Sequence, residues 1–144
     1  MSYSGKFIPK NPNKYVGDAN NIIYRSSWEC RCMSYFDRTD EVISWASEEL
    51  NIPYRSPVDG KIHRYFPDFI IRVKSGDKTK TIMIEVKPYK QTQPPKQRSR
   101  VTKQYITEVA TYGVNQSKWK AAEEYCKDRN WEFKILTEID LGIN

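Results

Sequence analysis

Cysteine and histidine are scarce in this chain, and their scarcity excludes several kinds of site. The 144 residues include three cysteines and one histidine. Cys30 and Cys32 are two residues apart on a predicted helix and Cys126 stands alone, so no pair has the spacing of a zinc-binding motif. With His63 as the single histidine, neither a zinc site nor a Ser-His-Asp triad is predicted. We expect reduced cysteines that serve in packing or on the surface.

Long apolar runs and glycine-rich loops are also missing. No run approaches the roughly 20 apolar residues that a transmembrane helix needs, and the first residues lack the apolar core of a signal peptide. Cytoplasmic residence is therefore expected. No phosphate-cradling glycine loop is present. Hydrophobic residues make up 38% and charged residues 29% of the chain, which suits one soluble globular domain of 144 residues.

Acidic residues are absent from one stretch, residues 87–103, which carries as much positive charge as the whole chain. The net charge is +6, and this stretch alone holds six basic residues and no acid: Lys87, Lys90, Lys96, Arg98, Arg100 and Lys103. A local basic strip favours a polyphosphate partner such as DNA, which releases counterions on binding. A solvated loop with incidental lysines is the alternative interpretation.

The N-terminal residues 1–23 are predicted to be an irregular basic arm, ahead of a folded domain over residues 24–144. The arm contains prolines, asparagines and three lysines that could also contact DNA: Lys6, Lys10 and Lys14. A helix is predicted from Ser26 or Ser27 as N-cap. Its apolar spacing predicts a buried stripe of Trp28, Cys32, Tyr35 and Phe36, with Glu29 at the border of that stripe.

The rest of the chain predicts an α/β sheet covered by helices. Three or four mainly antiparallel strands are expected over residues 50–56, 61–66, 67–73 and 79–87, with residues 40–50 ambiguous between helix and strand. A proline- and glutamine-rich loop follows over residues 88–97. Two helices are then expected, over residues 100–112 and 116–129, because Gly113 is predicted to end the first. The final strand is predicted over residues 131–136.

The polar residues inside two of these strands form the candidate site. Side chains alternate faces along a strand, so Glu85 and Lys87 point the same way, and pairing through a turn at residues 75–78 brings Asp68 beside them. Two carboxylates can hold a hard divalent cation, and a neighbouring lysine can orient water or offset charge on a phosphate. Glu29 is a possible third ligand. Asp68 could instead form a structural salt bridge with Lys87, and Glu29 could be a capping or surface acid.

The set Glu29, Pro67-Asp68 and Glu85-Val86-Lys87 resembles the signature of the PD-(D/E)XK nuclease superfamily. Within it, the chain is most similar to the head completion nucleases of large contractile-tailed phages. That similarity runs nearly end to end and includes Tyr24-Arg25-Ser26, Thr92-Gln93-Pro94-Pro95 and Lys118-Trp119-Lys120-Ala121-Ala122. A more distant similarity is to the endonuclease subunit of certain cut-and-paste transposons.

The resemblance implies a restriction-endonuclease-like mixed β-sheet flanked by helices. It implies Mg²⁺, with Mn²⁺ able to substitute, held by Asp68, Glu85, Glu29 and the carbonyl of Val86, while Lys87 positions the attacking water. Gln104 could occupy the place of an auxiliary glutamine in some relatives.

The implied function is metal-dependent DNA cleavage in phage head completion before tail attachment, in the host cytoplasm or associated with the virion. The alternative is a structural head or neck protein that grips DNA or contacts portal and neck proteins, with a vestigial nuclease site. A transposase-type subunit would need a partner-binding domain, for which 144 residues leave little room.

Overall fold

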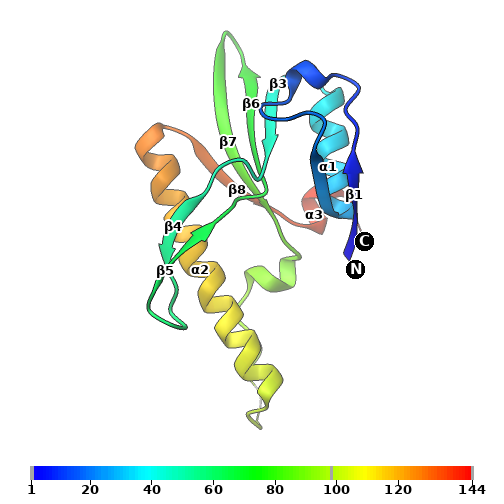
Figure 1. Ribbon diagram of the computed structural model, residues 1–144. Helices are drawn as coiled ribbons and strands as arrows, with labels where there is room; N and C mark the ends of the chain where they lie inside the picture. Colours follow the sequence, from blue (N-terminus) through cyan, green and yellow to red (C-terminus); the bar gives the residue numbers. More distant parts are fainter. Residues whose placement is uncertain (1, 98, 144) are drawn as a thin grey trace.

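The computed structural model describes residues 2–97 and 99–143, and it confirms the predicted α/β class with a mixed sheet flanked by helices (Figure 1). The elements follow one another as β1 (Ser2–Phe7), the 3-10 turn η1 (Pro12–Lys14), β2 (Ile22–Ser26), α1 (Ser27–Arg38), β3 (Val42–Ser47), β4 (Ile52–Arg55), β5 (Ile62–Tyr65), β6 (Phe69–Ser75), β7 (Lys78–Val86), the 3-10 turn η2 (Tyr89–Thr92), α2 (Lys103–Arg129), β8 (Glu132–Leu136) and α3 (Glu138–Leu141).

The central sheet has the strand order β3-β6-β7-β8, and two small sheets, β1-β2 and β4-β5, lie beside it. β6 is antiparallel to β3 and β7, whereas β8 runs parallel to β7 after the long α2 crossover. Neighbouring residues of β7 point to opposite faces. Ile82 and Ile84 therefore pack in one core with α1, and Met83 packs in the other with α2.

Helix α1 begins where the sequence predicts, but its buried face is rotated from the predicted stripe. The Ser26 hydroxyl accepts from the Glu29 N–H at 3.1 Å, which caps the helix. Cys32 and Phe36 are buried as expected, whereas Tyr35 is 57% exposed. The buried face instead contains Glu29, Met33 and Asp37. The prediction of Tyr35 was wrong because two carboxylates take apolar positions, and each is held by backbone N–H groups.

Helix α2 is continuous from Lys103 to Arg129, so the prediction of two helices separated at Gly113 was wrong. Gly113 lies inside the helix facing Pro57, whose Cγ would be 3.6 Å from a Cβ at this position. The helix ends instead at Asn130, which adopts the left-handed conformation (φ 62°) of a C-cap. Among the residues that the structure describes, no helix is long and apolar enough to cross a membrane.

The N-terminal arm is ordered, although the sequence predicted an irregular segment. β1 pairs with β2 in an antiparallel ladder. The buried Asp37 carboxylate accepts from the N–H groups of Lys10 and Asn11 at 2.8 and 3.1 Å. The Lys14 ammonium donates to three carbonyls at the end of α1, those of Phe36, Asp37 and Thr39. These contacts between distant parts of the chain fix an arm that lacks local periodicity.

Candidate active site

The register of β6 and β7 brings Asp68 and Glu85 together at one end of the central sheet. Phe69 is the Cα partner of Ile84, and Asp68 immediately precedes Phe69 while Glu85 immediately follows Ile84. The Val86 N–H donates to Asp68 Oδ2 at 2.7 Å, which fixes the orientation of that carboxyl group. The two carboxyl groups predicted from the sequence therefore lie side by side, as the hairpin required.

Glu29 reaches the same place from the first turn of α1. Its Oε2 atom accepts from the Arg25 N–H at 2.7 Å, and the side chain is buried. Burial, followed by the nearby charge of Asp68, raises the pKa of Glu29 from 4.5 to about 7. The hydrogen bond from the Arg25 N–H shows that Glu29 also stabilises the start of α1. Glu29 therefore has a capping role and lies close to Asp68 as well.

The Asp68 and Glu85 carboxyl groups hold their protons more tightly than isolated acids do. Burial raises the pKa of both groups, and the charge of Glu85 raises the pKa of Asp68 further. The Tyr65 hydroxyl lies close enough to lower the pKa of Glu85. Even so, neither Tyr65 Oη nor Glu85 Oε1 has a hydrogen-bond partner of normal geometry, although both atoms are buried. Glu85 therefore offers an unsatisfied lone pair to a ligand at this site.

Lys87 lies on the same strand face as Glu85, at the border of the carboxyl cluster. Its Nζ atom is 4.0 Å from Glu85 Oε2, and its side chain is 30% exposed. This separation is longer than a hydrogen bond. The alternative interpretation of the sequence was a structural salt bridge between Asp68 and Lys87. In the part of the chain that the structure describes, Lys87 instead forms its ion pair with Glu85. The ammonium group can still reach solvent beside the two acids.

The donor set fits a hard divalent cation. Ionised carboxylates are oxygen ligands of the kind that Mg²⁺ prefers. Such a cation would offset the cost of burying these charges, which raises the pKa of both groups, and the repulsion from Glu85 that raises the Asp68 pKa further. The unsatisfied Glu85 Oε1 atom is a ready ligand atom. Within residues 2–97 and 99–143, no group of three or more His, Cys, Asp and Glu side chains is arranged to hold a metal ion. The structure thus brings Asp68 and Glu85 side by side, with Glu29 next to Asp68 and its Oε2 atom bonded to the Arg25 N–H.

Glu48 and Arg25 support the carboxyl cluster, and neither was predicted as a site residue. The Glu48 N–H donates to the Asp68 carbonyl at 3.2 Å, and the Glu48 carboxylate pairs with Arg25 Nε at 3.0 Å. Glu48 adopts a positive φ of 52°, a strained conformation for a residue with a side chain. The Ser-x-x-Glu spacing from Ser26 to Glu29 is a capping signature that indicated this helix start. No local signal pointed to Glu48.

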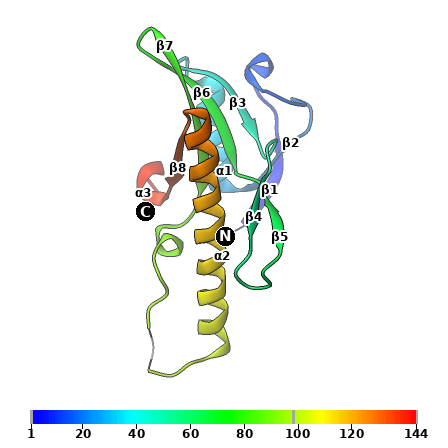
Figure 2. The ribbon, with the colours of Figure 1, turned by 90° about the vertical axis from the view of Figure 1, so that its left-hand side faces the viewer.

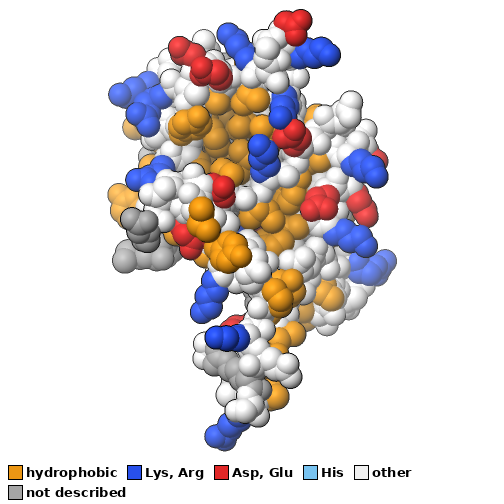
Figure 3. Space-filling model, turned by 180° about the vertical axis from the view of Figure 1, so that it is seen from behind, with side chains coloured by type: hydrophobic (Ala, Val, Ile, Leu, Met, Phe, Trp, Pro, Cys, Tyr) orange, Lys and Arg blue, Asp and Glu red, His pale blue; other side chains and the backbone are white. Residues whose placement is uncertain are grey.

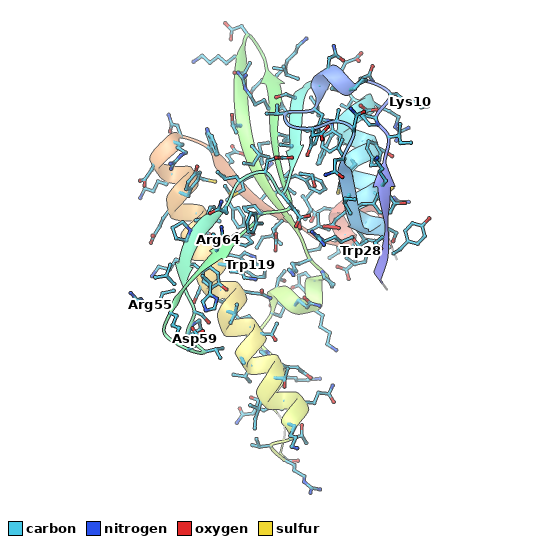
Figure 4. All side chains as sticks on the ribbon, viewed as in Figure 1. Lys10, Trp28, Arg55, Asp59, Arg64 and Trp119 are labelled. Atoms are coloured by element: carbon cyan, nitrogen blue, oxygen red, sulfur yellow. The ribbon has the colours of Figure 1, made fainter. Side chains whose placement is uncertain are left out.

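The predicted DNA-contacting residues divide into two groups. In the loop after β7 and at the start of α2, Lys90, Lys96, Arg100 and Lys103 are exposed, whereas Arg98 lies outside the described residues. Gln104 is in the first turn of α2, on the wall of a pocket shared with the loop. In the arm, Lys6 and Lys10 are exposed, and Figure 4 places Lys10 far from the loop, near the end of α1 opposite to Glu29. The Lys14 ammonium donates to three carbonyl groups, and its predicted DNA contact stays a prediction.

The raised pKa of Glu29 predicts that the metal-free protein loses stability as the pH rises. A group whose pKa is higher in the folded state than in the unfolded state stabilises the fold when protonated. This contribution is complete below pH 4.5 and is lost as the pH rises through about 7. We expect the melting temperature in EDTA to fall over this range. The Glu29→Gln variant should show a shallower fall by scanning calorimetry, and an unchanged slope in that variant would contradict the prediction.

Comparison with known proteins gives two findings. The family model described as TnsA-like endonuclease N terminal matches residues 39–138, a range that includes Asp68, Glu85 and Lys87. The chain is also 43% identical, over 145 aligned residues, to the head completion nuclease of Enterobacteria phage T4. That alignment covers 98% of this chain and 95% of the phage T4 protein. Both similarities agree with the resemblance seen in the sequence.

Proposed function

Because this chain belongs to the TnsA-like endonuclease N-terminal family and is 43% identical to the head completion nuclease of phage T4, we propose that it is a DNA endonuclease of head completion. We propose further that cleavage depends on a divalent metal and uses the PD-(D/E)XK arrangement. The observation that carries this proposal is the meeting of Asp68, Glu85 and Lys87 at one end of the sheet, with Glu85 Oε1 unsatisfied.

In this proposal Asp68, Glu85 and the Val86 carbonyl would hold Mg²⁺ or Mn²⁺, with Glu29 as a further ligand. The bound ion would polarise the phosphate and lower the pKa of a water molecule. Lys87 would orient the attacking water and offset negative charge as it develops on the phosphate. Arg25 would keep Glu29 in place through its backbone N–H.

The exposed basic residues after β7 would grip the DNA backbone. Lys90, Lys96, Arg100 and Lys103 follow Lys87 closely in sequence and extend from the same end of the sheet. Contacts between such side chains and phosphates position DNA without reading its sequence, and they weaken as salt is added. Lys6 can add to this surface. We do not include Lys10 in this surface because it lies at the far end of α1. Lys14 is also not included, because its ammonium group donates to carbonyls there.

The first test is cleavage of supercoiled and linear DNA in the presence of Mg²⁺, Mn²⁺ or EDTA. We expect nicking or cutting with either metal ion and none in EDTA, because the acidic cluster cannot activate water alone. Calorimetry should also show that Mg²⁺ raises the melting temperature, since a ligand that binds only the folded state stabilises it. Equal cleavage with and without EDTA would refute metal dependence.

A second candidate function, a structural neck protein that binds a portal or neck partner, is favoured by one specific observation. The outer part of α2 and the residues before it expose apolar side chains: Val101 (67%), Ile106 (58%) and Val109 (44%). Such side chains suit a protein interface. Firm DNA binding without cleavage under any of these metal conditions would favour this function. Either function would operate in the host cytoplasm during head assembly, and the second would leave the protein in the virion.

A further inference from the structure

A pocket of about 800 Å³ lies between the loop after β7 and the outer half of α2. One wall is formed by residues 90–96 of the loop, and the other by α2 residues between Gln104 and Asn115. The buried residues of α2 begin only at Asn115, so the first turns of the helix extend past the sheet (Figure 2). In the space-filling view from behind, this part forms a narrow arm with a notch between it and the body (Figure 3).

Both ends of the loop wall are anchored, so the pocket is a built feature of the fold. At the start of the loop, the Tyr89 N–H donates to Glu138 Oε1 at 2.7 Å. At its end, the Thr102 hydroxyl caps α2 by accepting from the Tyr105 N–H at 3.1 Å. The loop leaves β7 directly after Lys87, and Lys90 already lines the pocket. The pocket therefore begins within a few residues of the proposed catalytic lysine.

The residues that line this pocket are mostly neutral and polar, although most of the surface that they present to it is apolar. Amide side chains come from both walls, together with hydroxyl groups, two prolines and one aromatic ring: Gln91, Gln93, Gln104, Asn115, Thr107, Thr111, Pro94, Pro95 and Tyr112. Side-chain amides form hydrogen bonds with the edges of bases, and aromatic rings stack on base faces. Glu108 also lines the pocket. Lys90 and Lys96 supply positive charge for the backbone.

The size of the pocket suits single-stranded DNA and excludes duplex DNA. A volume of about 800 Å³ is in the range of small-molecule pockets, which suits a few unpaired nucleotides and is far too small for a duplex. Base edges and faces are accessible in an unpaired strand, whereas stacking and pairing conceal most of them in a duplex. An amide-rich pocket is thus suited to unpaired bases, and the basic surface outside it is suited to the phosphates of either form.

We infer that this pocket holds an unpaired DNA strand next to the phosphate that is cut, so that the preferred substrate is DNA with a single-stranded end, flap or gap. This inference rests on the proposed nuclease function and deepens it by naming the substrate class. The catalytic residues act on the phosphate at the sheet end, while the pocket selects DNA whose neighbouring bases are free.

The test is to fill the pocket and compare single-stranded with duplex DNA. Thr111→Trp places a large side chain in the pocket from α2, and Ile106→Trp is the matched control because Ile106 is 58% exposed and does not line the pocket. Binding of a fluorescein-labelled oligonucleotide, alone or annealed to its complement, is measured by anisotropy in EDTA so that no cleavage occurs. We expect Thr111→Trp to weaken single-strand binding about tenfold and duplex binding less than about twofold.

The rate of cleavage in Mg²⁺ is the second measurement that tests the inference. The wild-type protein should cut a duplex with a single-stranded overhang about tenfold faster than the same duplex with blunt ends, and Thr111→Trp should remove this preference while Ile106→Trp keeps it. If no DNA is cut, the nuclease proposal fails, and the binding comparison in EDTA still decides the role of the pocket. Equal effects of the two tryptophan variants, or equal wild-type binding of both DNA forms, would overturn the inference. Should Thr111→Trp fail to fold, Gln93→Ala with Gln104→Ala replaces it.

Discussion

Replacing Asp68 with asparagine is expected to abolish DNA cleavage and, at the same time, to stabilise the metal-free protein. Cleavage should fall by at least about 10³-fold, because the amide cannot supply the charge that holds a divalent cation. The fold should gain stability because the substitution removes one charge from a buried cluster in which burial and Glu85 raise the Asp68 pKa. The amide oxygen of the introduced side chain can still accept from the Val86 N–H, which Asp68 Oδ2 accepts at 2.7 Å in the wild type.

Plasmid cleavage in Mg²⁺ and calorimetry in EDTA measure these two effects. The stability gain should be largest at high pH, where the wild-type carboxyl groups ionise, and smallest at low pH, where they are protonated. Asp77→Asn is the matched control, since Asp77 is exposed in the turn at the opposite end of β6 and β7. A lower melting temperature for Asp68→Asn at high pH would show that the carboxylate stabilises the metal-free fold, contrary to the expectation.

Replacing Lys87 with alanine is expected to lower the rate of cleavage by about 10²- to 10⁴-fold with little change in DNA affinity. The Lys87 ammonium lies 4.0 Å from Glu85 Oε2 and is the cation that borders the two acids in the described structure. Its loss removes the group that would orient water and offset charge on the phosphate. Many other basic residues remain to bind the DNA backbone. Single-turnover cleavage and anisotropy measure the rate and the affinity separately.

Two further variants make the Lys87 experiment specific. Lys87→Arg keeps the charge but replaces a compact ammonium with a planar guanidinium, so we expect it to restore only a small part of the rate. Lys78→Ala removes an exposed lysine from the other end of β7 and should leave cleavage unchanged. Full activity in Lys87→Ala would exclude Lys87 from the reaction and would contradict the proposed catalytic set.

The charged residues that are proposed to act in catalysis could be found from the sequence because they lie in or next to elements with clear local signals. The period of two along residues 79–87 placed Glu85 and Lys87 on one face. The turn at residues 75–78 set the register that brings Asp68 to Glu85, as the structure confirms. The start of α1 was equally local, since the Ser26 hydroxyl and the Glu29 carboxylate both accept from backbone N–H groups within one helical turn.

Contacts between distant residues decided the rest, and no local pattern encodes them. Gly113 lies inside the continuous helix α2, facing Pro57 of the β4–β5 hairpin, although a glycine there predicts a helix end. The arm is ordered because Asp37 and the end of α1 bind its backbone and Lys14. Glu48 reaches Arg25 and Asp68 only through the turn between β3 and β4. The sequence by itself determined which groups are proposed to carry the chemistry, because alternation along a strand is local. Only the tertiary structure decided what supports those groups and which pocket lies beside them, because burial and packing depend on the whole chain.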